Sequence, residues 1–584
     1  MTDSQAPAQT AEIPALPVAE PPPPSRLWGL VTRRPYAVLA LLGLLLWLPG
    51  ILRLPPLDRD ESRFAQASRQ MVESGDPVDI RFGHVPRYKK PAGIYWLQSA
   101  STIITGKIVH QGDTHHIWTY RLPSLLGAIA ASWLTLWCAL ALAGVEVGLV
   151  AGLLMAGSVL LTAEASIATT DAVLLASVLA VQGVLLRAYR AARDPDAPPP
   201  SRRLILLGWA ACAAGILVKF PVVPGVALVT LAGLAIWDRD VRWLRSLEPM
   251  RGVLLLLLLV MPWLVAITIQ SQGAFLEQSL GNDFAAKLAG GQESHGMWPG
   301  YFLLLSAATF FPAILFVAPG IVQGFARRGE PAIRFLLVWA GAWWLLVEAV
   351  PTKLPHYVLS SYPALAILGA LVVLTPPPAG FAVWWKAARW VAALQFALGA
   401  ILLTAAPLLL PRLYGAGDVW WLMALAGTGA ALAVAALVLG LRQSWRWALL
   451  LSLLAMLVFV PTLTAGVAPR LSQLWVTQRL KPLVVEASRP GDPPPALAGY
   501  QEPSMLFALG KDVVLTDGAG AADAGAKSGG LALVEDAELG AFLARLAELQ
   551  ADASAVSQLH GFNYSRGRKV HVTLYRVTQL RELP

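Results

Sequence analysis

The sequence predicts a mainly α-helical membrane protein that crosses the bilayer many times, and two observations carry this prediction. Of its 584 residues, 56% are hydrophobic and only 14% are charged, and the mean hydropathy is +0.58. In addition, apolar runs long enough to cross about 30 Å of hydrocarbon recur along most of the chain. This composition excludes a water-soluble protein of the same length.

The chain is expected to begin with a disordered cytoplasmic tail over residues 1–30, because its start is rich in Ala and Pro and ends in the run Pro21–Pro24. Arg33 and Arg34 then precede the first span. That span is longer than the core of a signal peptide, and no small-residue cleavage site follows it. We therefore expect an uncleaved anchor.

We expect about thirteen spans within a membrane domain over residues 31–466. Arginine-rich loops alternate with loops that are poor in arginine, as the positive-inside rule requires of a chain with a cytoplasmic amino terminus. An odd number of spans places the segment after residue 466 on the other side of the membrane. The expected spans are 36–54, 117–141, 145–164, 167–189, 204–219, 221–237, 252–271, 299–319, 335–350, 357–375, 390–410, 419–440 and 446–466.

The net charge and the cysteines exclude few classes of function. The formal charge of +9 comes mainly from short loops between spans, so it indicates topology rather than a nucleic-acid-binding patch. Cys138 and Cys212 both fall inside apolar spans. They form neither a disulfide framework nor a metal-type spacing.

Residues 467–584 are expected to form a small α/β domain outside the membrane. Strand-like pieces over 512–515, 531–534 and 569–577 flank a stretch over 536–549 that has helical periodicity. About 110 residues suffice for such a domain. It carries no catalytic spacing that we recognise, so a lid or a scaffold is the simplest interpretation.

The loop after the first span, residues 55–116, carries the strongest functional signal. It opens with three acids in four residues, and the basic pair Lys89-Lys90 follows beside a proline and two aromatic residues. Charges held against a membrane surface are costly unless they bind something charged. A phosphate carried by a lipid, together with a hydroxyl that must lose its proton, fits this mixture.

Part of this loop also has a purely structural interpretation. Asp58 could cap a helix with Glu61 as its partner, and Gly75 could end that helix. We expect this helix, but it gives Asp60 no role, so we favour a chemical function for Asp60. Lys89 is expected to extend its ammonium group to the headgroup region.

Further ionisable residues emerge on the same side of the membrane from other loops. A charge at the end of an apolar span is expensive unless it is paired, so a structural ion pair for Asp171 is as reasonable as catalysis. His295 and His356 lack partners at metal-ligand spacing, which favours hydrogen bonding over metal binding. The candidates in these loops are Asp171, Lys219, Lys287, His295, Lys353, His356 and Tyr357.

An ordered series of motifs resembles a known family. The segments DRDESRFAQASRQM, YKKPAGIYW, TTDAVL, GILVKFPVVPG and KLPHYVLSSYPAL resemble the bacterial aminoarabinose transferases of lipid A and the broader set of enzymes related to protein O-mannosyltransferases. The resemblance implies the GT-C glycosyltransferase fold, in which a bundle of membrane helices carries a periplasmic carboxy-terminal domain. It also implies transfer of a sugar, with inversion, from a polyprenyl phosphate to an acceptor.

The resemblance assigns roles to individual residues. Asp60, in the pair Asp60-Glu61, is expected to be the catalytic aspartate, with Glu61 and Asp171 as further catalytic acids. Three lysines are expected to hold the donor phosphate, although Phe220 replaces the glycine that usually follows the second of them. The expected phosphate ligands are Lys90, Lys219 and Lys353, with Arg87 and Lys287 in reserve, and the expected substrate-binding residues are Tyr88, Tyr95, His295, His356 and Tyr357.

One departure concerns a metal site. In the aminoarabinose transferases the residue before the loop lysine is an acid that helps to hold zinc, whereas this chain has Lys89. Since a lysine cannot replace a carboxylate ligand, we expect that zinc site to be absent and predict no cofactor. The same change argues against aminoarabinose as the sugar.

The sequence therefore predicts an inverting glycosyltransferase of the bacterial inner membrane whose active site faces the periplasm. Its expected partners are a polyprenyl phosphate sugar and an acceptor, with lipid A or the lipopolysaccharide core favoured and a secreted protein as the alternative. A transporter is the rival from another class, but its polar groups should lie near the bilayer midplane. A non-catalytic scaffold that binds lipid A is disfavoured by the number of candidate phosphate ligands around Asp60.

Overall fold

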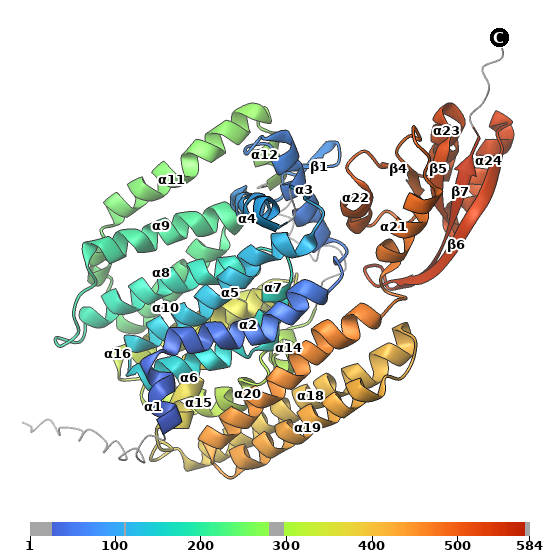
Figure 1. The fold of residues 1–584 in the computed structure, drawn as a ribbon. Helices are drawn as coiled ribbons and strands as arrows, with labels where there is room; N and C mark the ends of the chain where they lie inside the picture. Colours follow the sequence, from blue (N-terminus) through green and yellow to red (C-terminus); the bar gives the residue numbers. More distant parts are fainter. Residues whose placement is uncertain (1–25, 110–111, 280–296, 579–584) are drawn as a thin grey trace, which may run out of the picture.

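The computed structural model describes residues 26–109, 112–279 and 297–578. Long helices form a bundle, and a lobe of strands and short helices lies beside one end of it (Figure 1). The predicted mainly helical class is confirmed. The expected tail over residues 1–25 lies outside the described residues, whereas residues 26–30 are not part of a tail, because they open helix α1 (Arg26–Arg33).

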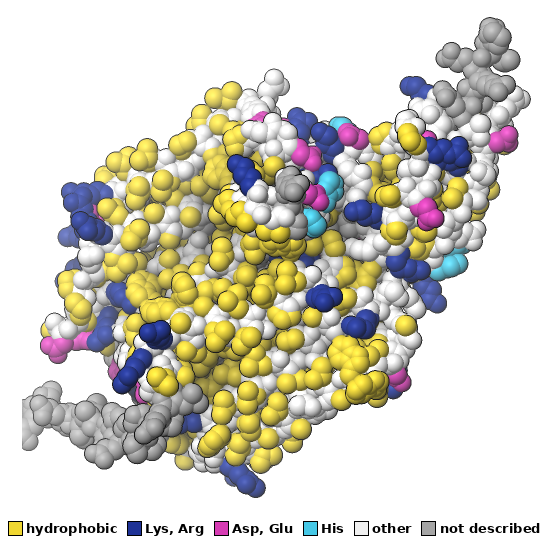
Figure 2. All heavy atoms as spheres, in the orientation of Figure 1, with side chains coloured by type: hydrophobic (Ala, Val, Ile, Leu, Met, Phe, Trp, Pro, Cys, Tyr) yellow, Lys and Arg dark blue, Asp and Glu magenta, His cyan; other side chains and the backbone are white. Residues whose placement is uncertain are grey.

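In the described part of the chain, nine helices are long and apolar enough to cross a membrane, or ten if one bent pair counts as a single span. The surface of the bundle that faces the viewer in Figure 2 is largely hydrophobic, as expected of a surface that contacts lipid. The nine segments are α2 (Pro35–Arg53), α5 (Ile117–Leu140), α8 (Asp171–Ala191), α11 (Pro249–Gln270), α16 (Pro331–Ala349), α17 with the turn before it (Pro355–Leu374), α18 (Ala382–Tyr414), α19 (Trp420–Leu441) and α20 with its extension (Trp445–Arg470).

The expected count of thirteen is not confirmed, because the other four predicted spans are short, broken or charged at their ends. Two of them are each divided into a pair of helices, and the first pair meets at 63°. Pro312 lies in the break of the second pair, and proline interrupts helical hydrogen bonding. The helices concerned are α6 (Val145–Ala156) with α7 (Val159–Ser166), α14 (Tyr301–Thr309) with α15 (Ile314–Ala326), α9 (Arg202–Lys219) and α10 (Val222–Asp238).

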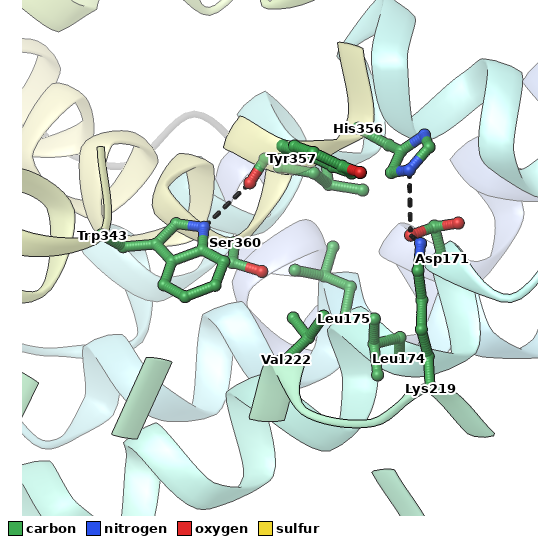
Figure 3. A pocket seen from close by; sticks show the side chains of 10 residues that line it. Asp171, Leu174, Leu175, Lys219, Val222, Trp343, His356, Tyr357 and Ser360 are labelled. Atoms are coloured by element: carbon green, nitrogen blue, oxygen red, sulfur yellow. Dashed lines mark hydrogen bonds and ion pairs between the residues drawn. The ribbon is translucent and has the colours of Figure 1, made fainter. Parts of the chain in front are cut away.

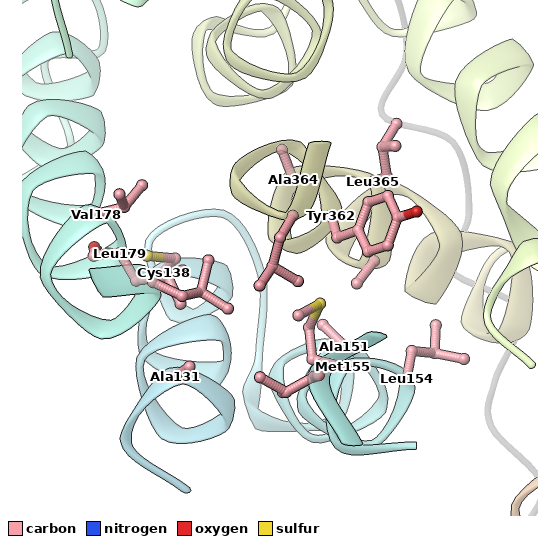
Figure 4. Close-up of a cluster of buried hydrophobic side chains, with 14 of the residues drawn as sticks. Ala131, Cys138, Ala151, Leu154, Met155, Val178, Leu179, Tyr362, Ala364 and Leu365 are labelled. Atoms are coloured by element: carbon pink, nitrogen blue, oxygen red, sulfur yellow. Dashed lines mark hydrogen bonds between the residues drawn. The ribbon is translucent and has the colours of Figure 1, made fainter. Parts of the chain in front are cut away.

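Small residues let the helices of the bundle approach closely. A Cβ atom on Gly127 of α5 would lie 2.7 Å from the backbone nitrogen of Val173 in α8, and one on Gly320 would lie equally close to the nitrogen of Gly369. Such contacts are typical of packing between membrane helices. Around them, buried side chains such as Met155 interlock in a continuous apolar core (Figure 4).

An ionic cluster gathers the predicted cytoplasmic loops at one end of the bundle. The Asp238 carboxylate lies 2.8 Å from the Arg193 guanidinium and 2.5 Å from that of Arg334, and it accepts a hydrogen bond from the Tyr189 hydroxyl at 2.6 Å. These partners come from three different loops or helix ends. The arginine-rich loops therefore lie together, as the charge pattern predicts for loops on one side of a membrane.

The first loop folds over the opposite end of the bundle. It contains α3 (Asp60–Ser74), a hairpin of β1 (Arg81–Phe82) and β2 (Val85–Pro86), and α4 (Gly93–Val109). The predicted end of α3 is confirmed, because Gly75 adopts a left-handed φ of +71°. The predicted cap is wrong, since Arg59 rather than Asp58 precedes the helix.

The carboxyl-terminal lobe, residues 476–578, begins with α21 (Val476–Ala487) and contains a five-stranded sheet in the order β4-β3-β5-β7-β6. The first three are parallel neighbours, and β7 and β6 extend the sheet in antiparallel fashion. The lobe also contains α22 (Pro503–Leu509) and α23 (Gly518–Ser528). The strands are β3 (Ala496–Ala498), β4 (Val514–Thr516), β5 (Gly530–Glu535), β6 (Ala553–Asn563) and β7 (Arg568–Val577).

Several sequence predictions for this lobe agree with its elements. The expected helix over 536–549 is α24 (Asp536–Leu549), and the three strand-like pieces overlap β4, β5 and β7. The sequence did not single out β3 or β6. The division of the chain into domains at residue 467 stays a prediction.

Candidate active site

The candidate site is centred on an ion pair at one end of the helix bundle. Asp171 is the first residue of α8 and Lys219 is the last residue of α9. Because α8 and α9 run in opposite directions, both side chains reach the same end of the bundle, and the Lys219 Nζ lies 2.7 Å from the Asp171 Oδ1. His356, from the short 3-10 helix Pro355–Ser361, places its Nε2 3.9 Å from the same oxygen (Figure 3).

Glu164 is a member of this cluster that the sequence analysis missed. It lies in the last turn of α7, and its Oε1 is 4.0 Å from the Nδ1 of His356. Its other oxygen accepts a hydrogen bond from the Thr169 hydroxyl at 2.8 Å. The His356 imidazole therefore lies between two buried carboxylates, those of Glu164 and Asp171. An acid inside an apolar run was the available signal.

Glu164, Asp171 and His356 are also residue types that can bind a divalent cation. The ligand atoms of Glu164, Asp171 and His356 all lie within 4.8 Å of one another. However, the Lys219 ammonium already forms an ion pair with the Asp171 oxygen at 2.7 Å. Its fixed positive charge would repel a metal ion bound there. We therefore assign no metal to this cluster.

A cavity of about 30 Å³ adjoins the ion pair. Leu174, Leu175 and Val222 form part of its wall, with Trp343 on one side (Figure 3). Tyr357 also lines it, and its backbone carbonyl accepts a hydrogen bond from the Trp343 indole at 2.8 Å. The cavity has room for roughly two water molecules. It is too small for a sugar, so a substrate would have to lie outside it.

Asp60 and Lys90 lie on the same side of the bundle as this cluster. The Asp60 side chain is 70% exposed and is 3.6 Å from the Arg63 guanidinium. Asp60 and Lys90 are both near enough to His356 to act on its charge, and Asp60 also acts on Glu164. The predicted loop acid and loop lysine thus lie at the same end of the bundle as Asp171 and Lys219.

Arg87, Tyr88 and Tyr95 line the first loop, where they contact one another or nearby residues. The Arg87 guanidinium donates to the Tyr95 hydroxyl at 3.2 Å. The Tyr88 hydroxyl donates to the Asp79 carboxylate at 3.0 Å, and burial raises the pKa of Tyr88 to about 12. Tyr88 is therefore protonated at neutral pH, and its hydroxyl is already engaged away from the cluster. Substrate contacts for these residues stay predictions.

Glu61 has a different environment from its neighbour Asp60. Its two carboxylate oxygens form a buried bidentate pair with Arg121, at 2.7 and 2.9 Å. They also accept hydrogen bonds from the backbone amides of Leu57 and Ala168, both at 2.8 Å. A carboxylate with four donors is not available as a base, so the geometry favours a structural role over the expected catalytic one.

Lys353 is also held by other groups. Its ammonium lies 3.2 Å from the Glu348 carboxylate and donates to the backbone carbonyls of Glu348 at 2.6 Å and Val350 at 3.2 Å. A lysine has three donors, so this buried side chain has none left for a phosphate. The expected role in phosphate binding is not favoured. Lys287 and His295 lie outside the described residues.

The carboxyl-terminal lobe contacts the segment immediately before Asp60. The Asp58 backbone amide donates to the Tyr564 hydroxyl at 2.6 Å, and the Arg59 guanidinium donates to the Ser565 carbonyl at 2.7 Å. The Ser504 hydroxyl donates to the Asp58 carboxylate. Burial at this contact raises the pKa of Asp58 to about 6. Sequence reasoning could not find these contacts, because the partners are more than 400 residues apart.

Comparisons with proteins of known structure identify the fold. The Cupriavidus metallidurans protein ArnT, crystallised bound to undecaprenyl phosphate, superposes with a TM-score of 0.70 over 93% of this chain and 98% of its own, at 20% identity. The apo form of that protein gives the same TM-score at 18% identity. The chain has the GT-C fold. The expected architecture is thus confirmed for a multi-pass membrane protein.

Sequence similarity agrees with this fold but covers less of the chain. The family of dolichyl-phosphate-mannose-protein mannosyltransferases matches residues 89–265. The undecaprenyl phosphate-alpha-4-amino-4-deoxy-L-arabinose arabinosyl transferase of Edwardsiella ictaluri is 26% identical over 337 residues, which are 57% of each chain. The enzyme of the same name from Pectobacterium carotovorum is 23% identical over 405 residues, 67% of this chain and 68% of its own. The chain therefore resembles the aminoarabinose transferases in sequence, and the match spans 57% of the length of the first relative.

Proposed function

We propose that this protein is an inverting glycosyltransferase that moves a sugar from a polyprenyl phosphate to an acceptor outside the cytoplasm. The observation that carries the proposal is the grouping of Asp60, Lys90, Asp171 and Lys219 at one end of the membrane helices. The relatives named for undecaprenyl phosphate sugars, and the fold shared with a protein crystallised with undecaprenyl phosphate, support the same donor.

The lysines provide the electrostatic part of the mechanism. A polyprenyl phosphate becomes an adequate leaving group once its developing charge is neutralised, so no general acid is required. Lys90 and Lys219 would stabilise the departing phosphate from fixed positions, which avoids reorganisation during the reaction. Asp171 holds the Lys219 ammonium in place at 2.7 Å. Apolar spans beside the cluster would bind the isoprenoid tail.

Asp60 provides the base. Its side chain is 70% exposed and lies 3.6 Å from the Arg63 guanidinium, so it is accessible to an acceptor. On the face of the sugar opposite the phosphate, Asp60 would accept the proton of the acceptor hydroxyl as the new glycosidic bond forms. The carbon–oxygen bond to the phosphate breaks in the same step, which inverts the anomeric centre.

The neighbouring acid positions this base. Because the buried pair of Glu61 and Arg121 fixes the first turn of α3 to α5, Asp60 at the start of that turn has a defined place. We therefore assign Glu61 a positioning role and Asp60 the chemical one.

The acceptor is proposed to be lipid A or the lipopolysaccharide core, by the similarity to the aminoarabinose transferases. A hydroxyl group of a secreted protein is the second candidate, which the match of residues 89–265 to protein mannosyltransferases favours. The site of action would be the periplasmic face of a bacterial inner membrane. Transport is not favoured, because the charges gather at one end of the bundle rather than at its middle.

Mass spectrometry of the cell envelope tests this function. Lipid A, core oligosaccharide and envelope proteins would be compared between cells that produce the wild-type chain and cells that produce Asp60→Asn. We expect one sugar to be missing from one of these fractions in the variant. Glu73→Gln, at the other end of α3, where the half-buried carboxylate lies 2.7 Å from Arg69, is the matched control and should leave the sugar in place. Identical envelopes in all three strains would contradict the proposal.

A further inference from the structure

A second cavity, of about 230 Å³, lies in the carboxyl-terminal lobe. Its walls include the residues at the carboxyl ends of three parallel strands: Gly499 after β3, Asp517 after β4 and Glu535 at the end of β5. The chain passes from β3 to β4 on one side and then to β5 on the other. The crevice outside the carboxyl ends of parallel strands, where the strand order reverses in this way, is the common ligand site of such sheets.

The backbone at Gly499 is adapted to a close approach of two strand ends. Gly499 adopts a φ of +86°, and a Cβ atom there would lie 2.6 Å from the Cβ of Glu535. A residue with a side chain would therefore push the Glu535 carboxylate from the cavity. With glycine, this carboxylate lines the cavity although its side chain is 3% exposed, and the Arg568 guanidinium holds it at 2.8 Å.

The lining chemistry limits the class of ligand. Seven of the nine lining residues are polar, so a purely apolar ligand is disfavoured. The three carboxylates outnumber the two guanidinium groups, and Arg566 and Arg568 already pair with Glu502 and Glu535 at 3.5 and 2.8 Å, so a free anion is disfavoured. A sugar ring suits this mixture, because each hydroxyl can donate to a carboxylate and accept from a guanidinium or an amide. The polar lining residues are Gln501, Thr516, Asp517, Glu535, Glu538, Arg566 and Arg568.

The size and the position of the cavity agree with one saccharide unit of an acceptor. Its volume lies below the range of roughly 300–1,000 Å³ that is typical of sites for drug-sized ligands. The cavity is lined by Arg566 from the turn between β6 and β7 and by Arg568, the first residue of β7. Tyr564 and Ser565 of the same turn contact Asp58 and Arg59. A glycan in the cavity would thus be held by the turn that contacts the chain immediately before Asp60.

We propose that the carboxyl-terminal lobe binds the saccharide portion of the acceptor in this cavity. The assignment of the bound saccharide to an acceptor rests on the proposed function, but binding itself does not depend on catalysis. The donor sugar is not the expected occupant, because the proposed ligands of its phosphate belong to the first loop and the membrane helices rather than to this lobe.

Calorimetric binding to the full-length protein in lipid nanodiscs tests this inference. The probes are a delipidated lipopolysaccharide oligosaccharide, a water-soluble sugar 1-phosphate as a donor mimic, and a serine-rich peptide without sugars. Ala537→Leu places a larger side chain at an exposed position of the cavity wall. Ala544→Leu is the matched control, because Ala544 is also exposed on α24 and does not line the cavity.

We expect the oligosaccharide to bind saturably and Ala537→Leu to weaken this binding by about tenfold, whereas Ala544→Leu should leave it unchanged. In transfer assays Ala537→Leu should raise the KM for the acceptor and leave kcat unaltered, as loss of uniform binding does. The inference is overturned if the oligosaccharide does not bind, if Ala537→Leu binds it as the wild type does, or if only the sugar phosphate or the peptide binds. Transfer without oligosaccharide binding would refute this site alone, whereas binding without transfer would refute the proposed function alone.

Discussion

Lys219 and Asp171 form an ion pair of 2.7 Å between the end of α9 and the start of α8, with side chains that are only 14% and 10% exposed. Removal of one partner from a buried pair leaves the other charge uncompensated, whereas replacement of both can be nearly neutral. This asymmetry separates the role of Lys219 in stability from its proposed role toward the phosphate.

Lys219→Met should therefore lower the free energy of unfolding by about 3 kcal/mol and abolish sugar transfer. The double variant Lys219→Met/Asp171→Leu should recover most of that stability without recovering transfer. Thermal unfolding in detergent and a transfer assay on the same samples measure both quantities. A double variant that regains both would show that Lys219 acts only through stability.

Asp60 and Glu61 should differ in the same two measurements. Asp60→Asn should abolish transfer and leave the melting temperature unchanged, because the Asp60 side chain is largely exposed. Glu61→Gln should lower stability by a few kcal/mol, since it disrupts a buried pair with Arg121, and transfer should decrease in parallel. Equal stability of the wild type and Glu61→Gln would argue against the positioning role.

Asp58 should make the contact between the lobe and the first loop dependent on pH. Burial raises its folded-state pKa from 3.8 to about 6, so the folded protein binds this proton more tightly than the unfolded chain does. The resulting stability is fully present below a pH of about 4 and is lost as pH rises through about 6. Asp58→Asn should remove this dependence and stabilise the protein at pH 7 by up to about 3 kcal/mol. Melting temperatures between about pH 4.5 and 7.5 measure the effect, and parallel curves for wild type and variant would contradict it.

Tyr564→Phe should affect catalysis from the lobe. The change removes the hydroxyl that accepts a hydrogen bond from the Asp58 backbone amide at 2.6 Å. Such a hydrogen bond contributes about 1 kcal/mol to stability. Because the segment before Asp60 would then be less fixed, kcat should decrease several-fold while the KM for the donor stays constant. Tyr575→Phe, in β7 of the same lobe and packed against Phe542, is the control. Equal kcat values for the two variants would indicate that the contact with Asp58 does not position the base.

Local patterns predicted much of this fold. The apolar runs located the membrane helices, Gly75 marked the end of α3, and helical periodicity gave α24 over Asp536–Leu549. The number of spans was less predictable, because hydropathy does not reveal a 63° bend between α6 and α7. Local sequence also cannot show which residues lie against a distant segment.

The candidate site shows the same limit. Asp60 and Glu61 are adjacent acids that the sequence alone does not distinguish. Only the contact of Glu61 with Arg121, 60 residues away, separates the two. Lys353 looked like a phosphate ligand, yet its donors are used by a neighbouring acid and backbone carbonyls. The position of Glu164 inside an apolar run indicates that this acid is paired, but only the structure shows that His356 lies 4.0 Å from it.

Single-turnover transfer by the purified protein tests the central claim most directly. The protein in nanodiscs would be mixed with a radiolabelled polyprenyl phosphate sugar and lipid A, and both donor consumption and donor binding would be followed. The account predicts transfer by the wild type and, for Asp60→Asn, donor binding without transfer. Transfer by Asp60→Asn at the wild-type rate, or a wild-type protein that leaves every polyprenyl phosphate sugar intact, would contradict it.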